Sequence, residues 1–107
     1  MKEKKEATQL QKKVWEKLNE IPKGSVTTYK LLAQAIESRA VRAVASAVGK
    51  NPNAPKTPCH RVVLSSGEIG NYTHPEGVSR KIELLEGEGV SVENGKVLNF
   101  ENILYKF

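Results

Sequence analysis

Cysteine and histidine are scarce in this sequence, since its 107 residues include one cysteine and two histidines. A single cysteine cannot form a disulfide within the chain, so the sequence favours a reducing compartment and a free thiol. A zinc site needs about four ligands at close spacing, and His74 lies far along the chain from the pair Cys59-His60. We therefore expect no metal site, and no residue pattern indicates a cofactor.

Long apolar segments are also missing. No stretch is apolar for long enough to cross a membrane, and the charged residues 1–6 lack the apolar region of a signal peptide. The 38% hydrophobic and 27% charged residues are typical of a soluble globular protein, here expected in the cytoplasm with no membrane partner. The length predicts one domain over residues 1–107, with residues 1–7 expected to be flexible.

Positive charge is in excess. Lys and Arg number 17 against 12 Asp and Glu, which gives a net charge of +5 at pH 7. A small basic domain is compatible with a polyanionic partner such as nucleic acid. The excess alone decides nothing, because many basic proteins bind no nucleic acid. The lysines of residues 2–13 fit a solvated face better than a nucleic-acid contact.

Three helices are predicted in the first half of the chain. Residues 8–20 have an amphipathic pattern around Trp15, with Thr8 as the N-cap. Further helices are expected over residues 28–36 and 40–48. Two short helices joined by a tight break are typical of a helix-turn-helix. The helix at 40–48 consists mostly of small residues, which allow the close approach of another surface.

The second half is predicted to combine short strands with one helix. Residues 61–64 are mostly apolar and include two β-branched valines, which favours a strand. Residues 80–86 are expected to form a helix with Ser79 as its N-cap. The pair Asn94-Gly95 between apolar residues predicts a β-hairpin. The apolar tail is expected to pack back on the domain. The predicted fold class is therefore α+β, mainly helical, with short β-strands.

Cys59 is the candidate nucleophile, because an imidazole and a guanidinium follow it directly in His60 and Arg61. For an arbitrary Cys-His pair, an inert buried thiol is the better interpretation. Arg61 is open to two interpretations, an anchor beneath the site or a contact to a ligand. The neighbouring motifs have to decide.

Several motifs occur in one order between Leu10 and Gly89. They are Pro58-Cys59-His60-Arg61-Val62, Thr28-Tyr29-Lys30-Leu31-Leu32-Ala33, Arg42-Ala43-Val44 with Asn51-Pro52, Gly70-Asn71-Tyr72, and Arg80-Lys81 through Leu84-Leu85 to Glu88-Gly89. Together they resemble the catalytic domain of the O6-alkylguanine-DNA alkyltransferases, which is C-terminal in that family. The resemblance implies a winged-helix-like DNA-binding fold and repair of DNA by direct reversal.

The resemblance also implies a chemistry for Cys59. In the family the cysteine takes the alkyl group from O6 of guanine, so each molecule acts once. A histidine, here His60, removes the thiol proton through a water, and a glutamate orients the histidine. Alignment assigns that glutamate to Glu88, with Glu86 as a close rival. On a strand, neighbouring side chains point oppositely, which makes a water bridge between Cys59 and His60 easier than direct contact.

The expected partner is double-stranded DNA that contains O6-alkylguanine, bound through its minor groove by a monomer. The target base must be flipped out of the duplex. The resemblance implies that Arg42 fills the space that the flipped base leaves in the duplex. It also implies that Tyr29 helps to rotate the phosphate of the target nucleotide. Small residues such as Ala43 and Ser46 would let the helix enter a groove roughly 6 Å wide. Asn51 would tie this helix to the segment of Cys59.

The pocket for the flipped base is expected to use backbone groups of Cys59 and Val62, with Tyr72 along its wall. Thr73 would face O6, and Lys81 would assist the departing guanine. Ala45 stands where the family has glycine, and the loop over residues 73–76 is longer than usual. The location would be the nucleoid of a prokaryote or the nucleus of a eukaryote.

Three alternatives compete with this hypothesis. The first is a non-enzymatic alkyltransferase-like protein that binds and flags O6-alkylguanine; that class replaces the nucleophile, which Cys59 argues against. The second is a helix-turn-helix regulator that reads the major groove, for which the helix at 40–48 has few polar side chains. The third is a Cys-His protease, which has no oxyanion motif to support it.

Overall fold

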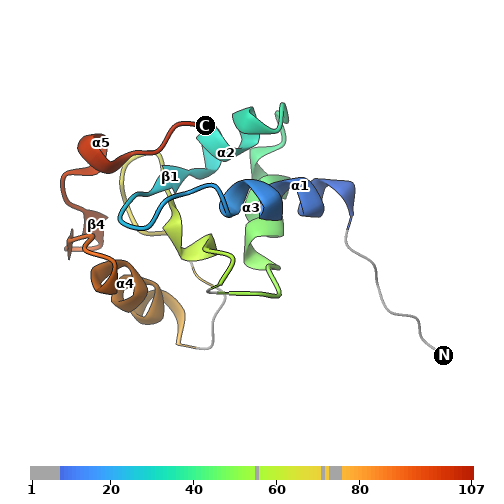
Figure 1. The fold of residues 1–107 in the computed structure, drawn as a ribbon. Helices are drawn as coiled ribbons and strands as arrows, with labels where there is room; N and C mark the ends of the chain where they lie inside the picture. Colours follow the sequence, from blue (N-terminus) through green and yellow to red (C-terminus); the bar gives the residue numbers. More distant parts are fainter. Residues whose placement is uncertain (1–7, 55, 71, 73–75) are drawn as a thin grey trace.

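The computed structural model describes residues 8–54, 56–70, 72 and 76–107. Within these residues, Figure 1 shows three helices gathered on one side of the molecule and the hairpin with the last two helices on the other. The helices are α1 (Gln9–Leu18), α2 (Tyr29–Ala35), α3 (Val41–Gly49), the 3₁₀ helix η1 (Cys59–Arg61), α4 (Gly77–Gly87) and α5 (Phe100–Ile103). The strands are β1 (Thr27–Thr28), β2 (Val62–Val63), β3 (Val92–Glu93) and β4 (Lys96–Val97).

The N-terminal helix starts where the sequence predicts. Thr8 and Gln11 form a capping box at the start of α1, each side chain accepting the backbone N–H of the other residue at 3.0 Å. Trp15 joins α1 to α3, because its indole N–H donates to the carbonyl of Ala47 at 2.8 Å. Trp15 is partly buried and packs against the core cluster under these helices, so the contact holds α1 and α3 together.

The break between α2 and α3 is a tight C-terminal turn. Glu37 adopts a left-handed conformation with φ of 59°. The N–H of Ser38 donates to the carbonyl of Ala33 at 2.9 Å, and that of Glu37 to Gln34 at 3.0 Å. This pair of bonds is the Schellman arrangement that ends many helices. It turns the chain at once into α3 and completes the helix-turn-helix.

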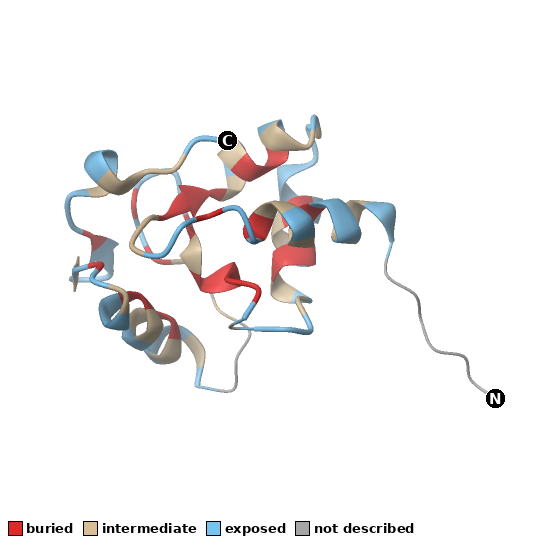
Figure 2. Cartoon of the chain, in the orientation of Figure 1, coloured by how far each residue is buried: buried red, intermediate tan, exposed pale blue. Residues whose placement is uncertain are grey.

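A two-stranded parallel sheet separates two cores. β1 pairs with β2, with Thr27 opposite Val62 and Thr28 opposite Val63. Successive side chains of a strand point to opposite faces, so Val62 joins the cluster under α1, α2 and α3 while Val63 joins the cluster under α4. Figure 2 shows the buried residues of both clusters on the inner faces of the surrounding helices. The segment that carries Cys59 therefore lies at the junction of the two cores.

The hairpin and the C-terminal tail are confirmed. Asn94 and Gly95 both have positive φ, at 53° and 76°, between β3 and β4. The tail packs beside β1, where Leu104 forms a parallel bridge with Val26. The backbone N–H of Tyr105 donates to the carbonyl of Val26 at 2.7 Å. The α+β, mainly helical fold with a helix-turn-helix is thus confirmed. Among the described residues, no helix is both long enough and apolar enough to span a bilayer.

Two local predictions were wrong. Residues 59–61 form a 3₁₀ turn before β2, because the N–H of Arg61 donates to the carbonyl of Pro58 at 3.1 Å. Ser79 is not an N-cap, since α4 starts at Gly77 and the Ser79 hydroxyl donates to the carbonyl of Glu76 at 3.0 Å. After β4 the left-handed Asn99, with φ of 59°, caps the start of α5.

Candidate active site and nucleic-acid interface

Cys59 opens the 3₁₀ turn and is buried, with 4% of its surface exposed. Its N–H donates to the carbonyl of Thr57 at 2.8 Å. The same carbonyl accepts the side-chain amide of Asn51 at 2.7 Å. Because Asn51 follows the C-terminal end of α3, this bond ties the helix-turn-helix to the turn that carries the thiol. In a 3₁₀ helix neighbouring side chains are rotated by about 120°, so the strand argument for Cys59 and His60 does not apply.

A partly buried ionic cluster of His60, Arg61 and Glu88 follows the thiol in the structure. His60 is 1% exposed, and its Nε2 lies 2.8 Å from Oε2 of Glu88. Arg61 donates to both oxygens of the same carboxylate, from Nε at 2.8 Å and from Nη2 at 2.7 Å. Its Nη1 donates to the carbonyl of Ile21 at 2.7 Å. Arg61 thus anchors the cluster to the loop after α1, and Glu88, not the exposed Glu86, carries the pairing carboxylate.

The cluster sets the charges of its members. Burial lowers the pKa of His60 below 6.5, and outweighs the opposing effect of the Glu88 carboxylate. Burial acts to raise the pKa of Glu88, but the hydrogen bonds from Arg61 and His60 dominate and hold it below 4.5. At pH 7 the imidazole is therefore neutral beside an ionised carboxylate.

This pairing also selects the tautomer of His60. A neutral imidazole has one N–H and one lone pair, and the nitrogen that faces an ionised carboxylate carries the proton. Nε2 is that nitrogen. Nδ1 is buried and has no hydrogen-bond partner among the described residues. His60 is therefore arranged to accept a proton at Nδ1.

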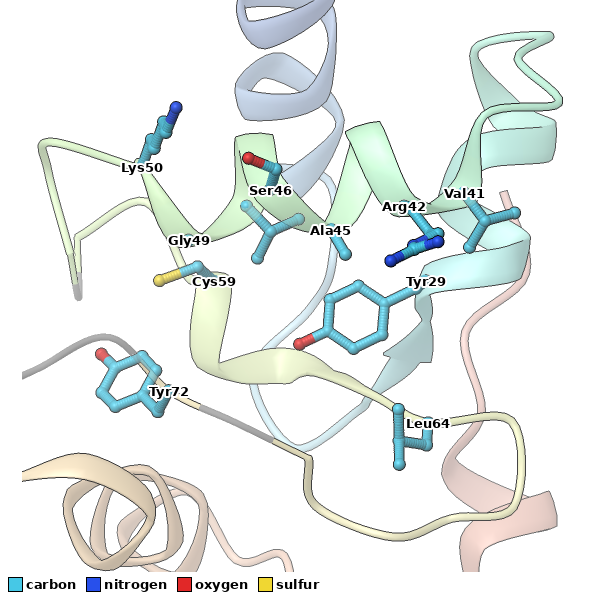
Figure 3. Close-up of a pocket in the computed structure, with 11 residues that line it drawn as sticks. Tyr29, Val41, Arg42, Ala45, Ser46, Gly49, Lys50, Cys59, Leu64 and Tyr72 are labelled. Atoms are coloured by element: carbon cyan, nitrogen blue, oxygen red, sulfur yellow. The ribbon is translucent and has the colours of Figure 1, made fainter.

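A pocket of about 620 Å³ opens over Cys59. It is lined by Tyr29, Val41, Arg42, Ala45, Ser46, Val48, Gly49, Lys50, Cys59, Leu64 and Tyr72. Figure 3 shows Cys59, Lys50 and Tyr72 at one end of the pocket, and Arg42 above the ring of Tyr29 at the other. Burial and the proximity of Cys59 raise the pKa of both tyrosines to about 12, so both stay protonated.

Lys81 lies behind the pocket wall. Its side chain is fully buried, and its ammonium donates to the carbonyl of Ile69 at 2.7 Å. The ammonium also lies 5.9 Å from the centroid of the Tyr29 ring. Burial lowers the pKa of Lys81 to about 8, while the nearby Cys59 opposes the shift. The amine is thus mostly charged at pH 7, in an apolar setting where charge is costly.

The outer face of α3 has the composition that a groove contact needs. Arg42, Ala43 and Ser46 are exposed, whereas Val44 and Ala47 on the opposite face are buried. Small exposed side chains around one arginine allow the helix backbone to approach a partner closely.

The structure brings some of the predicted site residues together and leaves others apart. Tyr29, Arg42, Ser46, Cys59 and Tyr72 share the pocket. Val62 is fully buried, does not line the pocket, and donates its N–H to the carbonyl of Cys59. Ala43 is exposed on α3 but does not line the pocket. Thr73 lies outside the described residues.

Five residues that line the pocket were not predicted from the sequence. They are Val41, Val48, Gly49, Lys50 and Leu64. Val41 and Lys50 flank the small-residue helix at its two ends, and this position next to the expected groove contact was the available signal. Leu64 had none, because its exposure results from the turn that follows β2.

The sequence profile of the family described as "6-O-methylguanine DNA methyltransferase, DNA binding domain" matches residues 9–90. The chain belongs to this family. A methylated-DNA–protein-cysteine methyltransferase of Candida glabrata is 42% identical over 90 residues, which are 83% of this chain and 42% of that protein. The bifunctional transcriptional activator and DNA repair enzyme Ada of Escherichia coli is 46% identical over 87 residues, 80% of this chain and 24% of that protein. The chain thus spans less than half the length of either relative.

Solved structures of the family share the fold. Mycobacterium tuberculosis OGT in complex with DNA has a TM-score of 0.72 and 42% identity, covering 78% of this chain and 51% of that one. S. pombe Atl1, in complex with damaged DNA that contains O6-carboxymethylguanine, has a TM-score of 0.82 and 29% identity. That match covers 96% of this chain and 100% of the other. The family's fold is therefore present over nearly the whole chain.

Proposed function

We propose that this chain is the catalytic domain of a DNA repair alkyltransferase, the domain that is C-terminal in longer relatives. It would transfer the alkyl group from O6 of guanine in double-stranded DNA to Cys59. The observation that carries the proposal is the buried thiol at the base of an open pocket, next to the His60–Glu88 pair. The names of relatives in the same family support it.

The chemistry follows from the charge states. The thiol of Cys59 loses its proton to Nδ1 of His60, and the ionised Glu88 stabilises the imidazolium that forms. The sulfur then attacks the alkyl carbon; the S–C bond forms as the C–O6 bond breaks, and the electron pair leaves with guanine. The departing anion takes up one proton from solvent, and His60 releases the proton that it took from the thiol, so the proton count balances. The ammonium of Lys81 and the hydroxyl of Tyr29 lie near enough to the pocket to stabilise that anion.

The thioether product has no easy way back to a thiol, and the chain has no second cysteine. Each molecule is therefore expected to react once. With excess duplex containing O6-methylguanine, the restored guanine should reach a plateau at one equivalent per protein molecule, measured by digestion and chromatography of the DNA. Continued turnover beyond one equivalent would contradict the proposal.

DNA would be held by the exposed face of α3 in the minor groove, with Asn51 linking that helix to the thiol. Arg42 is exposed, lies at the pocket rim, and would occupy the gap left by the flipped base. The protein would act as a monomer. It would be located with the genome, in the cytoplasm of a prokaryote or in the nucleus of a eukaryote.

Arg42→Ala should slow the reaction with duplex DNA and leave the alkyl-transfer step itself largely unchanged. Reaction with duplex O6-methylguanine is expected to slow by about tenfold or more, because the flipped state loses the side chain that replaces the base. Reaction with free O6-benzylguanine, which needs no flipping, should change by less than about twofold. Single-turnover rates on both substrates provide the measurement, and Lys30→Ala on the exposed surface of α2 is the control. An equal loss on both substrates would argue against this role.

A second candidate function is binding without transfer. It is favoured by the match to Atl1, which extends over 96% of this chain. A protein of this kind would bind the lesion duplex tightly and leave O6-methylguanine intact. The plateau experiment distinguishes the two, because binding alone restores no guanine.

A further inference from the structure

One of the two cations that line the pocket lies at the end of Cys59, where the alkyl group must lie. Among the described residues, Arg42 and Lys50 line the pocket and no Asp or Glu does. Figure 3 places Lys50 at the end of Cys59 and Arg42 at the opposite end, over Tyr29. The alkyl carbon has to reach the sulfur, so any atoms attached beyond that carbon extend into the end of the pocket that contains Lys50.

Lys81 adds positive charge behind the Tyr29 side of the pocket. Its buried ammonium lies 5.9 Å from the ring of Tyr29, which is part of the pocket lining. Two described acids, Glu83 in α4 and Glu88 at its C-terminal cap, are paired with other side chains. Glu88 accepts from His60 and Arg61, and Glu83 accepts from Arg80 at 2.7 Å. Within an apolar pocket, such charges act over several ångströms with less screening than in water.

Lys50 can come closer to a ligand than it does in the structure. Figure 3 shows its ammonium directed outward, away from Cys59. The side chain is exposed, and four rotatable carbons let a lysine fold over a charged group. Its backbone is fixed, because the N–H of Lys50 donates to the carbonyls of Ser46 and Ala47 at 3.1 Å and 3.2 Å. Lys50 is thus a mobile cation on a rigid base at the mouth of the pocket.

We propose that the pocket favours O6-alkyl groups that end in a carboxylate, such as carboxymethyl, over neutral groups of the same size, and that Lys50 sets this preference. The proposal rests on the proposed function and names a substrate class for it. In the reaction, the Cys59 thiolate forms a bond to the methylene carbon while the C–O6 bond breaks. The electron pair leaves with guanine, and S-carboxymethylcysteine remains with its carboxylate facing Lys50.

The test compares two duplexes of identical sequence at pH 7, one with O6-carboxymethylguanine and one with its neutral amide, O6-carbamoylmethylguanine. Single-turnover rates are measured for the full chain and for Lys50→Gln, with Lys30→Gln as the matched surface control. The ratio of the two rates cancels the effect of any contact between Lys50 and DNA phosphates, because the substitution removes such a contact from both duplexes equally. Lys50→Gln is expected to lower the carboxylate-to-amide ratio about threefold, the effect of one exposed charge pair.

The change in the carboxylate-to-amide ratio decides whether Lys50 sets the preference. A fall in the ratio for Lys50→Gln, with an unchanged ratio for Lys30→Gln, supports the proposal. A ratio that Lys50→Gln leaves unchanged, or that both variants lower equally, overturns it and leaves the proposed function standing. A third duplex with O6-methylguanine separates the two proposals. If it alkylates Cys59 in the unmodified chain but the carboxymethyl duplex reacts no faster than the amide, only this inference fails. If none of the three duplexes alkylates Cys59, the proposed function fails as well.

Discussion

Cys59→Ala is expected to abolish alkyl transfer while DNA binding stays within about twofold of the original. The thiol is the only cysteine of the chain and is buried under the pocket. Alanine fits the site, because only a sulfur is removed, and the cost of the small cavity is about 1 kcal/mol. The groups expected to bind DNA lie on the outer face of α3, away from the substitution. Transfer is measured as methyl-labelled protein, and binding by fluorescence anisotropy with a lesion duplex.

Cys59→Ser is the matched control, since the hydroxyl keeps the size and polarity of the thiol. A serine hydroxyl ionises far less readily than a thiol, so this variant should also be inactive. Labelled protein from either variant would show that the alkyl group is accepted elsewhere. Loss of binding together with transfer in both variants would show instead that Cys59 supports the DNA interface.

The stability of the protein is expected to rise with pH between about 8 and 10 because of Lys81. Burial lowers the pKa of Lys81 to about 8, whereas its unfolded value is 10.5. Between these values the unfolded chain binds more protons than the folded chain, so the free energy of unfolding increases as pH rises. The contribution over this interval is about 2 kcal/mol. Above pH 10 the raised pKa values of Tyr29 and Tyr72 act in the opposite direction, as the unfolded tyrosines ionise first.

Lys81→Met isolates this contribution. Methionine fills a similar volume without a charge, so the variant should lack the rise and should be more stable than the original at pH 7. The variant also loses the hydrogen bond to the carbonyl of Ile69. This loss shifts the free energy of unfolding by a similar amount at pH 8 and pH 10, so it does not account for a difference in the dependence on pH. Urea unfolding of both proteins at pH 7, 8, 9 and 10 gives the comparison. Parallel curves would mean that the amine is not desolvated in the folded protein.

Helix positions and turn chemistry could be read from the sequence because their causes are local. Thr8 caps α1, Thr28 caps α2 by accepting the N–H of Leu31 at 3.1 Å, and Asn94-Gly95 forms the hairpin turn. These features depend on side chains within a few residues of one another. The 3₁₀ turn at Cys59 was missed, because its β-branched neighbours favour a strand locally while Thr57 and the Asn51 contact shape the turn from outside.

Part of the candidate site could be predicted from the sequence, but its electrostatics could not. The motif order pointed to Cys59, His60 and Glu88, but spacing alone could not choose between Glu88 and Glu86. The choice depends on where α4 ends, and Arg61 completes it through a bidentate contact across 27 residues of sequence. The burial of Lys81 was equally hidden, since helical periodicity placed apolar residues inward and gave no reason for a lysine at a fully buried position.

The mass of the peptide that contains Cys59 tests the central claim most directly. The protein is incubated with a duplex containing one O6-methylguanine, digested and analysed by tandem mass spectrometry. A gain of one methyl group located on Cys59, absent after incubation with unmodified duplex, is the predicted result. An unchanged peptide from protein that nevertheless binds the lesion duplex would contradict the account, and would assign this chain to lesion binding without transfer.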